Sequence, residues 1–140
     1  MPQRDIELIL FRQLASRLAV PILLVDESGD LLFFNEPAER LLGQRFDDVG
    51  EITLEERSEA FAFRDKDGNP VPDDQVPLVV ALRERRPVHR LVSLRGFDGI
   101  YRAIEVTAFP LLGPGGHLIG GVVMFWEKRD AGREAGAGGR

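Results

Sequence analysis

The chain has 140 residues, a length that suits one domain, and 44% of them are hydrophobic, which is enough for a substantial core. Lys and Arg total 18 against 23 Asp and Glu, so the net charge of −5 gives no general attraction to nucleic acid or anionic lipid. The absence of cysteine excludes disulfides, thiolate metal sites and a cysteine nucleophile, and two histidines alone make no well-supported metal site.

No apolar run approaches the roughly 20 residues that a membrane-spanning helix needs. Charges at Asp5, Glu7 and Arg12 interrupt the first apolar residues, a pattern unlike a signal peptide. We therefore expect a cytoplasmic protein with no membrane or nucleic-acid partner.

Residues 4–18 are predicted to form a helix with two apolar stripes. One stripe consists of Leu8, Phe11, Ala15 and Leu18, and the other of Ile6, Leu10 and Leu14. Together they are wider than one neighbouring element requires. The helix therefore either lies on its own domain or pairs with a second copy of the chain.

Residues 22–43 predict a hairpin followed by a short capped helix. Two apolar runs, 22–25 and 31–34, flank a turn in which Gly29 can adopt a positive φ. Asn35 is suited to cap a helix, and Gly43 is suited to end it.

The middle of the chain is less regular. Residues 44–65 predict short helical turns, with 60–63 either a short strand or an irregular wall. A turn at 67–70 precedes a helix over 78–86, which Pro87 ends.

Three strands follow, over residues 88–95, 101–112 and 118–126, and Gly-rich turns make them an antiparallel meander. The tail from residue 129 is predicted to be disordered because it holds little to bury.

Three segments in this order resemble a PAS domain, over residues 14–127. They are the hairpin-Asn-helix opening, VDESGDLLFFNEPAERLLG; the approach to the long helix, DGNPVP followed by PL and ALR; and the paired segments VTAFPL and LIGGVV. The resemblance implies an α+β fold: a five-stranded antiparallel sheet with helices on one face, a small cavity between them, and an N-terminal helix. It divides the chain into a dimerisation or capping helix (1–18), a PAS domain (19–128) and a tail (129–140).

Similarity to PAS ligand sites, combined with strand alternation, predicts a mostly aliphatic pocket. Its residues are Leu78, Leu82, Arg90, Val92, Leu94, Ile104, Val106, Ala108, Gly120, Val122 and Met124. The pocket either takes a small apolar ligand, such as a fatty acid or an aromatic metabolite, or is a filled core. An inward Arg90 needs a partner or a ligand carboxylate, unless it reaches solvent at the cavity mouth.

The opposite face of the last strand is also apolar, so something must cover it. We predict a homodimer that uses the N-terminal helix and this face. The predicted interface comprises Ile6, Leu10, Phe11, Leu14, Leu18, Ile119, Val123 and Phe125.

No cofactor is expected. Flavin-binding light sensors of the family carry an Asn-Cys-Arg motif that this chain lacks, and haem-binding members usually use a histidine on the long helix. Residues 78–86 contain none; His89 lies just after them and His117 in a hairpin turn. The neighbouring acid pairs 47–48, 55–56 and 73–74 are interpreted as solvated surface, without an accompanying nucleophile.

The sequence thus predicts a sensory or interaction module without catalysis of its own. The first alternative is a small ligand-binding protein or enzyme with an α+β cavity, and the second is a purely structural dimerisation domain. An effector such as a kinase or a transcription regulator would receive the signal. Relatives end near an Asp-Ile-Thr triplet, which Glu127-Lys128-Arg129 does not match. Output therefore depends on a partner chain, or the chain is a fragment.

Overall fold

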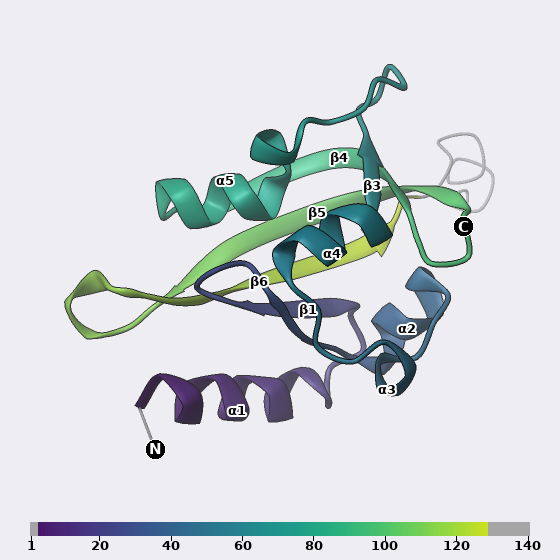
Figure 1. The fold of residues 1–140 in the computed structure, drawn as a ribbon. Helices are drawn as coiled ribbons and strands as arrows, with labels where there is room; N and C mark the ends of the chain where they lie inside the picture. The colour runs from purple at the N-terminus through teal and green to yellow at the C-terminus, as the bar shows by residue number, and fades with distance from the viewer. Residues whose placement is uncertain (1–2, 129–140) are drawn as a thin grey trace, which may run out of the picture.

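A computed structural model describes residues 3–128 of the chain, apart from the side chains of residues 3–5, 58 and 59. These residues form one six-stranded antiparallel sheet in the order β2-β1-β6-β5-β4-β3 (Figure 1). The strands are β1 (Ile22–Asp26), β2 (Leu31–Phe34), β3 (Ala62–Arg64), β4 (Val88–Arg95), β5 (Tyr101–Leu112) and β6 (Leu118–Glu127). The α-helices are α1 (Gln3–Ala15), α2 (Glu36–Leu42), α3 (Phe46–Val49), α4 (Leu54–Ala60) and α5 (Pro77–Glu84).

The sheet separates two apolar clusters. The inner cluster joins the sheet to α2, α3 and α5, and it holds Phe34, Leu42, Leu78 and Phe125 among its buried residues. The outer cluster is smaller and joins α1, through Leu8 and Ala15, to β1 and β6. In Figure 1, α1 accordingly runs along β1 on the side away from α5.

The predicted α+β class, the antiparallel sheet and the N-terminal helix are confirmed. The sheet has six strands rather than five, because β3 pairs with the outer edge of β4 through Phe63 and Leu94. The helix predicted over 78–86 ends at Glu84, since Arg85 adopts a left-handed conformation with φ 58°. The tail at 129–140 lies outside the described residues.

Asn35 connects four segments through one buried side chain, which is 1% exposed. Its Oδ1 accepts hydrogen bonds from the N–H of Ala38 (3.2 Å), which caps α2, and from the N–H of Ile22 (3.0 Å) at the start of β1. Its Nδ2 donates to the carbonyls of Ala15 and Val20, both at 2.9 Å. The cap is the predicted one. Of the other three bonds, the one to Ala15 fastens the end of α1 to the domain, and those with Val20 and Ile22 hold the segment that leads into β1.

The prediction of which β6 residues face the inner cluster is wrong by one position along the strand. Val122 is fully buried in the outer cluster and Met124 packs against that cluster, while a Cβ on Gly120 would lie 3.3 Å from Leu8. Val123 and Phe125 pack instead with the inner cluster.

The register of the sheet explains this facing. Every residue from Val122 to Phe125 is apolar, so alternation alone does not choose between the two faces. Ala108 pairs with Val123 and Val106 with Phe125, and directly paired residues share a face of the sheet. Because β5 directs Val106 and Ala108 into the inner cluster, β6 directs their partners there as well.

The predicted interface residues on β6 are therefore not a free surface. Phe125 is buried in the inner cluster, and Ile119 is buried in the outer cluster, where the chain's own segments cover it. The exposed residues of the predicted interface all lie in the N-terminal segment. Ile6, Leu10, Leu14 and Leu18 are exposed, and Phe11 is partly buried against the sheet.

We expect Asn35→Ala to lower the free energy of unfolding by about 2–4 kcal/mol. The substitution removes the α2 cap and leaves the N–H of Ile22 without its buried partner. The carbonyl of Ala15 loses the bond from Asn35 and keeps the bond from the N–H of Leu18. Urea unfolding followed by circular dichroism measures the change.

A matched control is Thr53→Ala, which removes the exposed side-chain cap of α4. It should cost about 1 kcal/mol. Equal losses for the two variants would show that Asn35 acts only as a helix cap.

Candidate functional site

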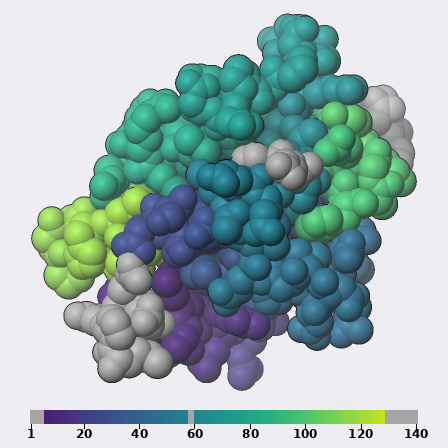
Figure 2. Space-filling model, in the orientation of Figure 1, coloured from purple at the N-terminus to yellow at the C-terminus, as the bar shows by residue number. Residues whose placement is uncertain are grey.

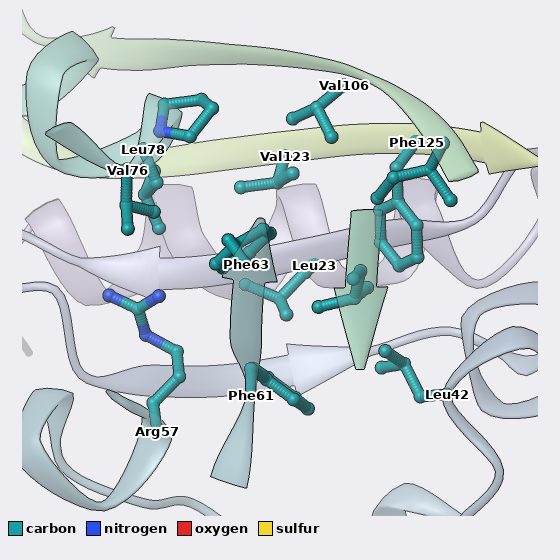
Figure 3. A pocket seen from close by; sticks show the side chains of 13 residues that line it. Leu23, Leu42, Arg57, Phe61, Phe63, Val76, Leu78, Val106, Val123 and Phe125 are labelled. Carbon is teal, nitrogen blue, oxygen red and sulfur yellow. The ribbon is translucent and has the colours of Figure 1, made fainter. Parts of the chain in front are cut away.

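A small cavity lies between the inner sheet face, α4 and α5. Its volume is about 30 Å³, far below the several hundred Å³ usual for small-molecule sites. Of the predicted pocket residues, Leu78, Leu94, Ile104 and Val106 line it, together with Val123 and Phe125 from β6 (Figure 3). The remaining inward residues, Val92 and Ala108, are buried in the same cluster, and Leu82 packs against it.

An open cleft adjoins this cavity. Its volume is about 630 Å³, within the range usual for small-molecule sites. The cleft lies between α4, β3 and the segment 70–79, which form much of the teal surface in Figure 2. Arg57, Phe61, Phe63 and Val76 line both spaces, so these four side chains form the partition between cleft and cavity.

The wall that carries Arg57 is α4, and its start is fixed from two directions. Thr53 and Glu56 form a capping box, in which each side chain accepts a hydrogen bond from the other residue's N–H. The carboxylate of Asp30, in the β1–β2 turn, accepts from the N–H of Leu54 at 2.8 Å. These bonds hold α4 over the open side of the sheet, with Arg57 and Phe61 facing inward.

Arg57 is the one charged side chain that the described residues contribute to the cavity lining. It is 4% exposed. Its Nε donates to the carbonyl of Gly29 at 3.3 Å, while its buried Nη2 has no hydrogen-bond partner among the described residues. Figure 3 shows the guanidinium extending from α4 toward Val76 at the edge of the cavity.

Burial lowers the pKa of the Arg57 guanidinium to about 10, and the carboxylates of Asp30 and Asp73 only partly offset this effect. The guanidinium therefore stays charged at neutral pH although its surroundings disfavour the charge. Such a group is costly to the folded protein unless an anion pairs with it.

Arg57 was not predicted from the sequence as a site residue. The available signal was its spacing: Leu54, Arg57 and Phe61 recur at i, i+3 and i+7, so the arginine lies on the apolar stripe of a short helix. Arg90, the inward charge that was predicted, is exposed and does not line the cavity. Its side chain leaves β4 on the same face as Val88 and Val92, but it is long enough for its charged end to reach solvent.

His89 lies on the outer face of the sheet, away from the cavity. Its Nδ1 is 2.8 Å from the hydroxyl of Thr107, and its Nε2 is 3.7 Å from the carboxylate of Glu105. The indole N–H of Trp126 donates to the other oxygen of Glu105 at 2.9 Å. His117 bonds through Nδ1 to the carbonyl of Pro114 in the β5–β6 connection.

Among the side chains that the structure describes, His, Asp and Glu nowhere gather in a group of three suited to a metal ion. Over the same residues, no helix has both the length and the apolarity needed to cross a bilayer.

The opening hairpin with its Asn-capped helix, the curled sheet and the cavity beneath α5 agree with the family comparison. The sequence model of a protein family, described as the PAS fold, matches residues 9–129 of the chain. The chain belongs to the PAS family. PAS domains are generally sensory or signal-transduction modules, and they are typically non-catalytic.

Solved PAS structures resemble the chain in fold. The PAS domain of BvgS from Bordetella pertussis has a TM-score of 0.63 at 18% identity, covering 94% of this chain and 93% of that one. The PAS domain of nitrogen regulation protein NR(II) from Vibrio parahaemolyticus gives 0.59 at 17%, covering 85% and 98%. The LOV protein of Rhodobacter sphaeroides gives 0.69 at 14%, covering 98% and 74%. No curated protein matches the sequence.

We expect Arg57→Met to raise the free energy of unfolding of this PAS domain by about 1–2 kcal/mol. The lowered pKa means that the folded state disfavours the charged form, and methionine removes this cost while it loses only the bond to Gly29. Below pH 10 both the folded and the unfolded chain carry the charge, so the gain should be constant from pH 6 to 9. It should shrink only above about pH 10.

The matched control is Arg40→Met, which removes the same charge from an exposed ion pair with Glu36. Its effect should stay within about 0.5 kcal/mol. Urea unfolding at several pH values measures both variants. A clear loss of stability in Arg57→Met would mean that the guanidinium is already well paired.

Proposed function

We propose that this PAS domain is a sensory module that takes a small, mainly apolar molecule at the partition between cavity and cleft and has no catalysis of its own. The observation that carries the proposal is the lining: apart from Arg57, the described residues around the cavity present hydrocarbon. Enzyme chemistry needs several convergent polar groups, which this lining does not supply. The alternative of an enzyme with the same α+β cavity is therefore the weaker candidate.

The volumes of the cavity and of the cleft determine where a ligand has room to bind. A cavity of about 30 Å³ holds no ligand larger than a few atoms, so as it stands it matches the alternative of a filled core. The cleft of about 630 Å³ has room for a small metabolite. Movement of Phe61, Phe63 and Val76 would join the two spaces, and these side chains come from α4, β3 and the approach to α5. A ligand would thus change the packing of all three segments.

We expect the purified protein to carry an extra mass in native mass spectra that disappears under denaturing conditions. The reason is that a bound small molecule held by packing is released when the cavity unfolds. A clean native mass, together with no rise in melting temperature across a library of small acids, alcohols and aromatics, would favour the filled core and argue against the sensor.

We also propose a homodimer, on the evidence of α1. Leu8 and Ala15 are buried against the sheet, whereas Leu10 is 58% and Leu14 52% exposed. Ile6 and Ile9 are also exposed on the helix, and Leu18 is exposed just after its end. A second copy that pairs along α1 would remove this surface from water.

For this dimer we expect the double substitution Leu10→Glu, Leu14→Glu to give a monomer at high micromolar concentration, because it places charges in the middle of the exposed stripe. Ile100→Glu, which changes an equally exposed residue of the β4–β5 turn, should leave the dimer intact. Light scattering measures both masses. Val123→Asp is not a suitable test, since Val123 packs into the inner cluster and the change would damage the fold. A monomeric wild-type protein would refute this part of the proposal.

An effector such as a kinase or a transcription regulator would read a change in α1 or at the end of β6, since these elements flank the described domain. The cytoplasmic location expected from the sequence stays a prediction.

A further inference from the structure

The unpartnered nitrogen of Arg57 points to the chemistry of the ligand. Nη2 is buried and lacks a hydrogen-bond partner among the described residues, and the side chain that carries it lines a cavity whose other lining residues are apolar. Native proteins rarely leave a buried donor unpaired, and a charged donor is the costliest kind. The neighbouring acids do not resolve this: Asp30 uses its Oδ1 to cap α4, and Asp73 is exposed on the short helix before α5. Both attract the guanidinium only across a distance.

We propose that the ligand of this PAS domain is a small monocarboxylate with an apolar body, and that Arg57 is the residue that recognises its carboxylate. The inference rests on the proposed ligand-sensing function and names the class of molecule. A carboxylate presents two acceptor oxygens that match the planar fork of a guanidinium. It would supply the acceptor that Nη2 lacks and neutralise the charge that burial disfavours.

The side chains around Arg57 indicate the chemistry of the rest of the ligand. The partition residues Phe61, Phe63 and Val76 are apolar, and Val79 and Val71 continue this wall into the cleft. The body of the ligand would lie along this wall, with the carboxylate at the junction of cleft and cavity.

The rim of the cleft sets a limit on ligand charge. Three exposed acids, Glu55, Asp73 and Asp74, line the cleft. A second negative charge on the ligand would lie in the cleft near these carboxylates and be repelled. The site therefore favours a single carboxylate over a dicarboxylate or a phosphate.

Three probes of equal chain length separate these features: octanoate, octanamide and suberate. Isothermal titration of the full chain should show octanoate binding about 10- to 100-fold more tightly than octanamide, which keeps the body and loses the charge. Suberate, with its second carboxylate, should also bind more weakly than octanoate. In Arg57→Met, octanoate should lose its advantage while octanamide binds as before. Arg57→Lys should keep part of the preference, and Arg40→Met all of it.

One measurement needs no variant. In wild-type protein, the carboxyl ¹³C resonance of labelled octanoate should titrate at a lower pH when bound than when free, because the guanidinium stabilises the ionised form.

The binding results separate a failure of the carboxylate assignment from a failure of the proposed ligand sensor. Equal binding of octanoate and octanamide, unchanged in Arg57→Met, would overturn the carboxylate assignment and leave the ligand sensor standing. Binding of none of the three probes would overturn the assignment as well, and the native mass spectra would then decide separately whether the domain holds a ligand at all.

Discussion

The side chain of Asn35 is the interaction on which the arrangement of this domain depends. One buried amide caps α2, fixes the first residue of β1 and holds the last turn of α1. Each of these bonds lies in a region that water does not reach, so none can be exchanged for hydration without cost. The consequence is that α1, which packs on the outer face through few residues, is nevertheless tied to the inner layer. A shift of α2 would therefore also move α1 and its apolar stripe.

Much of the fold was predictable because its signals are local. Gly29, Asn35 and Gly43 act through their own backbone geometry or through the next turn of chain, and they mark the limits of the hairpin and of α2 as predicted. The three long strands were likewise predicted from turn residues. The edge strand β3 was harder, because three residues have no period of their own and pair only once β4 is in place. The end of α5 at Arg85 lacked a glycine signal altogether.

The site was less predictable because it depends on which residues meet across the fold. The apolar lining from β4 and β5 was predicted, since polar neighbours on those strands mark the other face. On β6 both faces are apolar, so only pairing with β5 could decide that Val123 and Phe125 face inward. Arg57 was missed for a related reason. Its helix is one of the shorter ones, and its burial results from the β1–β2 turn that anchors α4.

The strand β6 also provides the protein with an optical signal. Trp126 is the sole tryptophan of the chain, and it follows directly after Phe125, whose ring lines the cavity. Trp126 is 37% exposed on the outer face and its indole N–H donates to Glu105. The centroids of the Trp126 and His89 rings are 6.4 Å apart. The emission of Trp126 is thus sensitive to the position of β6 and to solvent. Changes in the interior can in this way be followed by fluorescence, without attaching a dye.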